Sequence, residues 1–185
     1  MTQMVGRSLT LSEFLERPET EPASEYIDGK IIQKPMPQGE HSLIQGELCE
    51  AINRVVRAEK IARAFPELRC TVGGRSLVPD VAVFRWDRIP RSPAGKIANR
   101  FEISPDWAIE ILSPEQQMTV LLTKLLHYSQ NGTSIGWAID PRMETIFCIV
   151  ENQRLASFQG EAQLPVLDGI DLQLTAAEIL SWLVL

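Results

Sequence analysis

The 185-residue chain lacks the features of membrane proteins, disulfide-rich secreted proteins and zinc-binding proteins. Its apolar runs are only a few residues long, so we expect no transmembrane helix and no membrane partner. Residues 1–19 lack the hydrophobic core of a secretory signal peptide. Cys49, Cys70 and Cys148 are far apart and include no CxxC pair, which argues against a disulfide framework or a zinc knuckle. These absences favour the reducing cytoplasm.

Aromatic residues are scarce at 6%, but hydrophobic residues make up 44% of the chain. A chain of this length can bury about 70% of the surface that its unfolded form exposes, so it can build its own core. We expect one domain over residues 1–185, because domains usually have about 100–200 residues. The net charge of −6 argues against a general nucleic-acid coat protein.

The charge is distributed unevenly along the chain. Residues 54–100 contain 11 basic and four acidic residues, a net charge of +7, so the remainder of the chain carries −13. Such an asymmetry can mark a surface that meets a phosphate backbone. It is equally consistent with arginines that are simply solvated, and the charges alone leave both interpretations open.

Hydrophobic periodicity and turn residues predict alternating helices and strands. Asp28-Gly29 between two short apolar runs predicts a β-hairpin over residues 25–32. The run 106–112 is almost continuously apolar, which is typical of a strand buried on both faces. The expected fold class is α/β or α+β, with a mixed β-sheet flanked by helices. The other expected elements are helices after Thr10, over 40–63, over 114–130 and after Thr175, and strands over 68–72, 78–84, 135–139, 145–150, 154–158 and 171–174.

Two acidic residues, Asp80 and Glu110, interrupt strands that otherwise consist of core residues. A lone buried carboxylate is costly, so such a residue usually lies at a strand end, is paired, or binds a metal. Carboxylates from neighbouring strands would make an oxygen site suited to Mg²⁺ or Mn²⁺. The alternatives are a strand-edge turn for Asp80 and a buried ion pair of Glu110 with Arg75 or Lys124.

Lys124 lies in the helix expected after the Glu110 strand, with leucines on both sides of it. No polar helix face therefore accounts for this lysine. A lysine near a bound metal can orient water or neutralise developing charge. Because an Asp, a Glu and a Lys at such spacings also occur by chance, their spacing alone does not establish a catalytic site.

A set of motifs over about residues 11–150 is more specific than the spacing. The motifs are Glu25-Tyr-Ile-Asp-Gly, His41 before the long helix, Gly73-Gly-Arg-Ser-Leu-Val-Pro-Asp-Val-Ala-Val, Pro105-Asp-Trp-Ala-Ile-Glu-Ile-Leu-Ser-Pro, Lys124, and Gly132 leading to Gly136-Trp-Ala-Ile-Asp-Pro. Together they resemble the restriction-endonuclease-like family, formerly a domain of unknown function, within the PD-(D/E)xK nuclease superfamily.

The resemblance implies a restriction-endonuclease-like core, a mixed sheet between helices, and Mg²⁺-dependent (or Mn²⁺-dependent) hydrolysis of phosphodiester bonds. The N-terminal helix and the hairpin expected from the local signals would precede this core. It implies that Asp80 and Glu110 are catalytic and hold the metal, while Lys124 assists the attack of water. The superfamily's lysine would stand two residues after Glu110, where this chain has Leu112, and Lys124 matches its displaced position in the family. Many members carry an acidic residue one turn before this lysine, whereas this chain has Met-Thr-Val at 118–120.

Glu25 and His41 match positions typical of the family, so we expect them to support the site. Glu25 would bind the metal through water or hold Lys124; alternatively, it bonds to nearby backbone in its hairpin. His41 would orient a group of the site; alternatively, it caps its helix.

The expected function is that of a Mg²⁺-dependent deoxyribonuclease that acts as a homodimer. In the basic segment, we expect Arg75, Arg85, Arg88 and Arg91 to contact the phosphates of DNA. The alternative is a non-catalytic DNA- or protein-binding dimer that retains the nuclease fold. The negative net charge and the missing acidic helix residue favour this alternative.

Overall fold

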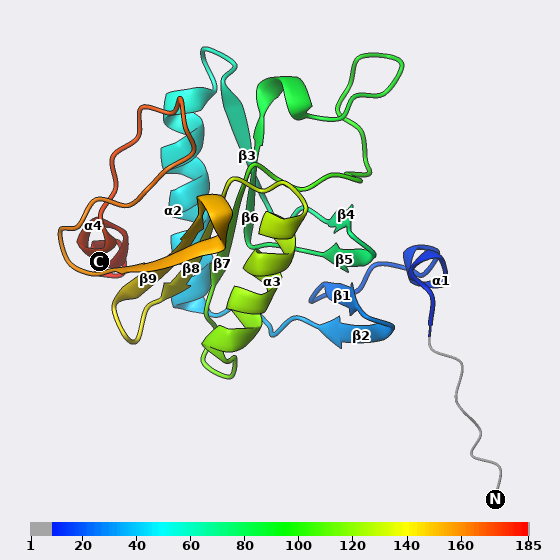
Figure 1. The fold of residues 1–185 in the computed structure, drawn as a ribbon, viewed down its shortest axis with the longest axis horizontal. Coiled ribbons are helices and arrows are strands. Elements are labelled where there is room, and N and C mark those ends of the chain that lie inside the picture. The colour runs from blue at the N-terminus through cyan, green and yellow to red at the C-terminus, as the bar shows by residue number, and fades with distance from the viewer. Residues whose placement is uncertain (1–8, 185) are drawn as a thin grey trace, which may run out of the picture.

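A computed structural model describes residues 9–184, which form two β-sheets with helices around them (Figure 1). The helices are α1 (Leu11–Leu15), α2 (Gly39–Val56), α3 (Met118–Gln130) and α4 (Ala176–Ser181). The strands are β1 (Ser24–Ile27), β2 (Lys30–Gln33), β3 (Ala62–Pro66), β4 (Cys70–Val72), β5 (Arg75–Leu77), β6 (Val81–Arg85), β7 (Trp107–Ile111), β8 (Ile135–Asp140), β9 (Thr145–Val150) and β10 (Arg154–Phe158). The larger sheet has the strand order β10-β9-β8-β7-β6-β3, and the smaller has the order β2-β1-β5-β4.

The two faces of the larger sheet are covered by different layers (Figure 1). On one face, α2 and α4 bury a cluster that includes Ile44 and Ile179. On the other face, α3 and the smaller sheet bury a cluster that includes Leu121, Leu125 and Leu77. Because strand side chains alternate between faces, the strands β3, β6, β7, β8 and β9 contribute to both clusters.

The helix α3 links the parallel neighbours β7 and β8, whereas the other neighbouring strands of both sheets are antiparallel. Parallel strands need a crossover connection, and this one carries α3 back over the sheet. The crossover therefore brings α3 above the strand that contains Glu110. Within residues 9–184, no helix is long and apolar enough to cross a membrane.

The expected fold class is confirmed, because the mixed sheet is flanked by helices. The predicted hairpin is formed by β1 and β2, and both residues of its Asp28-Gly29 turn have positive φ. Capping boxes start α1 and α4, where Thr10 pairs with Glu13 and Thr175 with Glu178. In these segments, local sequence signals were sufficient to predict the secondary structure.

The helix predicted over residues 40–63 is wrong at its C-terminal end. α2 ends at Val56, and the chain reverses through Lys60, which has a φ of 54°. Residues 57–60 are exposed and offer no large apolar side chain to continue the buried stripe of the helix. Ala62 and Ala64 are buried instead in β3, which pairs with β6.

Three other predicted boundaries are also wrong. The strand expected over 78–84 begins only at Val81, after Pro79, which has no amide hydrogen to donate. The helix expected from Pro114 begins at Met118, because residues 113–116 form a separate turn. Residues 171–174 are not a strand; they cross the surface and bury Leu174 in the core.

The outer edge of β3 is closed by a side chain of α2. Asn53 donates from Nδ2 to the Ala64 carbonyl at 3.0 Å and accepts the Ala64 N–H at Oδ1, also at 3.0 Å. The next outward-facing residue of the strand is Pro66, which has no N–H. An open strand edge invites pairing with another chain, so these two residues protect this edge of the sheet.

We predict that Asn53→Ala lowers the free energy of unfolding by about 1–3 kcal/mol, since it leaves the N–H and C=O of Ala64 unpaired. Urea unfolding followed by circular dichroism measures the difference. Asn99→Ala is the matched control, because Asn99 is exposed and makes no hydrogen bond within the described residues. Equal unfolding free energies for the two variants would contradict the edge-closing role.

Candidate active site

Asp80 and Glu110 lie next to each other at one end of β6 and β7. The strands are antiparallel, and Val81 is paired with Ile109. Extending this register by one residue places Asp80 opposite Glu110, with both side chains on the same face. This face is the one beneath α3, because Ala108 packs into the cluster there. Both residues are buried, with exposed fractions of 1% and 2%.

A lysine, a histidine and a backbone amide hold the Asp80 carboxylate. Lys34 Nζ lies 2.6 Å from Oδ1, and His41 Nε2 lies 3.1 Å from Oδ2. The Ile111 N–H donates to Oδ2 at 2.7 Å. Burial by itself would raise the pKa of Asp80, but the charges of Lys34 and His41 outweigh it and hold this pKa well below its usual range. Asp80 is therefore an anion at neutral pH.

Sequence reasoning missed Lys34, which follows β2 directly. Its ammonium group is buried and also donates to the Val78 carbonyl at 2.9 Å. Burial lowers the pKa of Lys34, but Asp80 more than compensates, so that the net shift is upward. Strand alternation could have indicated this position. Ile32 pairs with Glu25, so Lys34, two residues after Ile32, lies on the same face of the hairpin as Glu25.

Lys124 connects two carboxylates that belong to different sheets. Its Nζ lies 2.7 Å from Glu25 Oε1 and 2.7 Å from Glu110 Oε1. Glu25 Oε1 also accepts the Val78 N–H at 2.8 Å. Glu25 therefore holds Lys124, and its backbone partner lies outside the hairpin, unlike the nearby backbone of the alternative interpretation. Of the two partners considered for Glu110, the structure pairs it with Lys124, whereas Arg75 lies elsewhere.

Burial and charge act in opposite directions on this second group. Burial lowers the pKa of Lys124, but Glu110 and Glu25 outweigh it and raise this pKa above its ordinary value. Burial raises the pKa of Glu110 to about 7, although Lys124 opposes the shift. The Lys124 ammonium is thus a permanent cation at neutral pH, whereas Glu110 is the carboxyl most sensitive to added positive charge.

His41 is the third residue of α2, and the prediction that it caps this helix is wrong. The N-cap is Gln38, which makes no side-chain cap bond. The His41 ring turns inward to Asp80, and its Nδ1 is buried without a hydrogen-bond partner among residues 9–184. Gln45, one turn later on the same helix face, donates to the Asp80 backbone carbonyl at 2.8 Å and was also missed.

A pocket of about 470 Å³ opens beside this cluster. It is lined by Gln38, Gly39, Glu40, His41, Leu112, Pro114, Pro141 and Arg142. His41 belongs to both the pocket and the cluster, so the pocket provides access from solvent to the surroundings of Asp80. Leu112, at the position where the superfamily has its lysine, forms part of the pocket wall.

The two carboxylates fit a hard divalent cation that takes few protein ligands. Within the described residues, no group of three or more His, Cys, Asp or Glu side chains is arranged to hold a metal. Asp80 and Glu110 would therefore be the only side-chain ligands from the cluster. Mg²⁺ is usually bound in this way, through one or two carboxylates, with water and phosphate oxygens completing its shell.

The four arginines expected to bind DNA make no ion pair with the cluster in the described part of the chain. Three of their guanidinium groups lie within 4 Å of a carboxylate elsewhere. These pairs are Arg75 with Asp28 at 2.6 Å, Arg88 with Asp106 at 2.6 Å and Arg85 with Asp106 at 3.9 Å. Arg91 is exposed, and its guanidinium donates to the Trp86 carbonyl at 3.5 Å. A role in binding phosphate stays a prediction for all four.

A protein-family model matches most of the chain. It is the Uma2 model, described as "Putative restriction endonuclease", and it matches residues 11–177. The chain belongs to this family. The resemblance inferred from the motifs is thereby confirmed, and the match extends beyond residue 150 to include the start of α4. No curated protein matches the sequence.

A solved structure supports the same relationship for this Uma2-family chain. It is a crystal structure of "a putative nuclease belonging to DUF820" from Anabaena variabilis ATCC 29413, with 53% sequence identity. The match covers 95% of this chain and 99% of that chain, with a TM-score of 0.91. The DrdV–DNA complex matches only weakly, with 11% identity over 63% of this chain and 12% of that chain and a TM-score of 0.32, and contributes nothing to the argument.

We predict that Lys34→Met lowers the free energy of unfolding by about 3–5 kcal/mol in metal-free buffer, because it leaves the Asp80 carboxylate buried without its closest cation. Urea unfolding at pH 7 in the presence of EDTA measures the loss. Lys30→Met, in β2, is the matched control, since Lys30 is exposed and unpaired in the described structure. If both variants were as stable as the parent, the Lys34–Asp80 pair would not support the fold.

Proposed function

We propose that the protein is a Mg²⁺- or Mn²⁺-dependent endonuclease that hydrolyses phosphodiester bonds of DNA. The observation that carries this proposal is the placement of buried Asp80 and Glu110 on adjacent strands, with the Lys124 ammonium 2.7 Å from Glu110. Membership of the Uma2 family supports a nuclease. DNA as the substrate rests on the superfamily resemblance of the Pro-Asp, Glu and Lys motifs.

Asp80 and Glu110 would hold the cation between them, and bound there it would supply Lewis-acid chemistry to the phosphodiester. Asp80 suits this role because it stays ionised when buried. Metal binding would also favour the ionised form of Glu110, whose pKa burial otherwise raises to about 7. Both ligands are then anions at neutral pH.

Lys124 would act on the substrate and not on the cation. In hydrolysis, a water oxygen bonds to phosphorus while one P–O ester bond breaks, and negative charge builds up on the phosphate oxygens. A fixed ammonium group next to the reacting atoms stabilises this charge without reorganising. Glu25 holds the ammonium from the side of the smaller sheet, so its direction is set before substrate binds.

The pocket beside His41 is the proposed entry for the scissile phosphate. It combines the N-terminal end of the 18-residue helix α2 with the exposed cation of Arg142. Unpaired N–H groups at a helix N-terminus favour anions. The homodimer expected from the resemblance stays a prediction, which sedimentation equilibrium can test.

We predict that the protein binds Mn²⁺ in isothermal titration calorimetry and that Asp80→Asn abolishes the binding. The substitution keeps the shape of the side chain but removes one of two anionic ligands. Asp87→Asn is the control, because it removes the same charge from an exposed residue and should leave the Mn²⁺ affinity unchanged. Equal affinity of Asp80→Asn and the parent would exclude Asp80 as a ligand.

We predict that Lys124→Met slows cleavage of duplex DNA about 10²–10³-fold, as expected when one electrostatic partner of the transition state is lost. Its Mn²⁺ affinity should not fall, because the ammonium is not a ligand and repels the cation. Circular dichroism verifies that the variant is folded, and Lys96→Met, in an exposed loop, is the control. Undiminished cleavage by folded Lys124→Met would remove Lys124 from the mechanism.

A further inference from the structure

Four arginines of the described residues pair with a carboxylate, and Arg57 and Arg63 are among those that do not. The paired arginines are Arg69 with Glu19, Arg75 with Asp28, and Arg85 and Arg88 with Asp106. No carboxylate of residues 9–184 lies within 4 Å of the guanidinium of Arg57 or Arg63.

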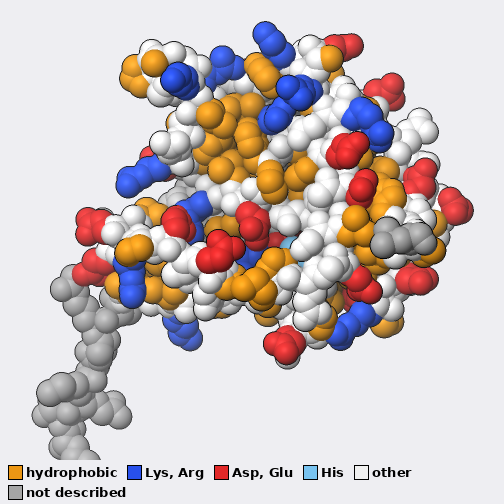
Figure 2. Space-filling view, turned by 180° about the vertical axis from the view of Figure 1, so that it is seen from behind, with side chains coloured by type: hydrophobic (Ala, Val, Ile, Leu, Met, Phe, Trp, Pro, Cys, Tyr) orange, Lys and Arg blue, Asp and Glu red, His pale blue; other side chains and the backbone are white. Residues whose placement is uncertain are grey.

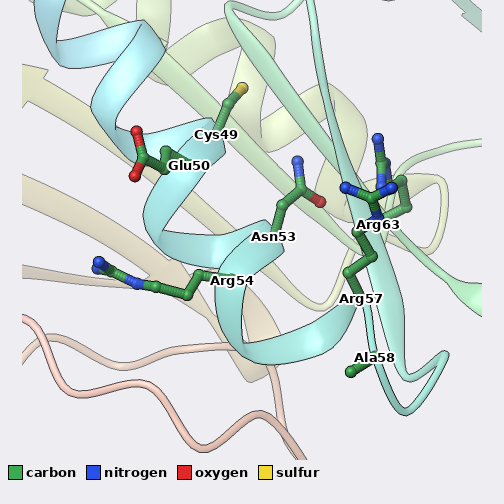
Figure 3. A pocket seen from close by; sticks show the side chains of 7 residues that line it. All are labelled: Cys49, Glu50, Asn53, Arg54, Arg57, Ala58 and Arg63. Atoms are coloured by element: carbon green, nitrogen blue, oxygen red, sulfur yellow. The ribbon is translucent and has the colours of Figure 1, made fainter.

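Arg57 and Arg63 line the same pocket, which has a volume of about 630 Å³ and lies where the end of α2 meets β3 (Figure 3). The other lining residues are Cys49, Glu50, Asn53, Arg54 and Ala58. Figure 3 shows the side chains of Arg57 and Arg63 directed toward the same end of the pocket. Glu50 and Arg54 point the other way, so the one carboxylate of the lining does not face this pair.

The protein holds this pair of cations together without neutralising it. Arg63 is fixed by β3, where its backbone pairs with Phe84 of β6. The Asn53 amide, which lies nearby, donates one hydrogen bond to the backbone of Ala64 and accepts one from it. Two guanidinium groups that share a pocket repel each other, and an anion from outside would remove this repulsion. The pocket therefore has the charge and the donors of an anion site.

We propose that Arg57 and Arg63 bind a backbone phosphate of the nucleic acid, at a site separate from the catalytic cluster. The proposal rests on the proposed function, because that function supplies the polyanion. Phosphate diesters suit the pocket, since a guanidinium group offers paired N–H donors that match phosphate oxygens. The arginines would position the substrate and take no part in bond breaking.

The position of the pocket is compatible with one duplex that reaches both sites. His41 lies near the start of α2 and Arg57 just after its end, about 16 residues or about 24 Å along the helix. This distance corresponds to about seven base pairs of duplex DNA. On the face shown in Figure 2, Lys and Arg side chains gather around a hydrophobic hollow in the upper half of the view. An adjoining pocket that shares Arg63 is lined by Phe65, Trp86 and Arg91, among others.

Fluorescence anisotropy with a labelled 30-base-pair duplex tests the proposal, in EDTA so that no cleavage occurs. Arg57→Gln and Arg63→Gln should each weaken binding about 3–10-fold and reduce the slope of log affinity against log salt by about one unit. Arg154→Gln is the matched control, since Arg154 is an exposed, unpaired arginine in β10, at the opposite edge of the sheet. Equal affinities and slopes for all three variants would overturn the proposal.

Cys49 provides an independent reporter of the same pocket. It is partly exposed in the pocket wall, whereas Cys70 and Cys148 are fully buried, so N-ethylmaleimide should modify Cys49 first. The duplex should slow this modification in the parent but not in Arg57→Gln/Arg63→Gln. Protection by ATP or inorganic phosphate, without protection by the duplex, would overturn nucleic acid as the ligand. Absence of protection by any of these probes would overturn the site.

The two proposals can fail separately. Suppose that the parent cleaves DNA and that the two arginine variants bind and cleave it as the parent does. The proposed nuclease activity is then retained, and the proposed phosphate site at Arg57 and Arg63 is rejected. If the parent cleaves no DNA but binds it in a manner that depends on Arg57 and Arg63, the pocket stands and the catalytic proposal fails.

Discussion

The bridge that Lys124 makes between Glu25 and Glu110 is the interaction on which the rest of the structure depends. It joins the hairpin of the smaller sheet to two elements that are distant from it in sequence, the central strand β7 and the crossover helix α3. All three side chains are buried, so each charge needs the others. Removing one member of such a group leaves an uncompensated charge and costs about 3–5 kcal/mol. The bridge therefore fixes how the smaller sheet docks on the larger one.

A second group, around Asp80, follows the same logic with different partners. Lys34 reaches Asp80 from the end of the hairpin, and His41 reaches it from the first turn of α2. The two groups meet because Asp80 and Glu110 are neighbours across the β6–β7 pair. When all are ionised, the three carboxylates and two ammonium groups leave one net negative charge, and the proposed divalent cation would complement it. Stability of the fold and the proposed binding of a cation therefore depend on the same carboxylates.

Folding disperses the basic segment that is continuous in the sequence. Arg63 lies in β3 at the edge of the larger sheet, whereas Arg75 lies in β5 of the smaller sheet. Arg75 and Arg88 pair with local carboxylates, whereas Arg57 and Arg63 have no carboxylate partner among residues 9–184. The net charge of a segment thus says little about the electrostatic field that a substrate meets, because the tertiary structure determines which carboxylate pairs with each arginine.

The sequence alone determined the fold class, the hairpin, the capping boxes and the prominence of Asp80, Glu110 and Lys124, and its motifs indicated the family that the match over residues 11–177 confirms. These features rest on local patterns or on acidic and basic residues in apolar surroundings. Only the tertiary structure decided that Lys34, His41 and Gln45 converge on Asp80 and that α2 gives way to β3 after Val56. The physical reason is that periodicity reports which side chains are buried, whereas partners for buried charges and strand edges come from segments that are remote along the chain.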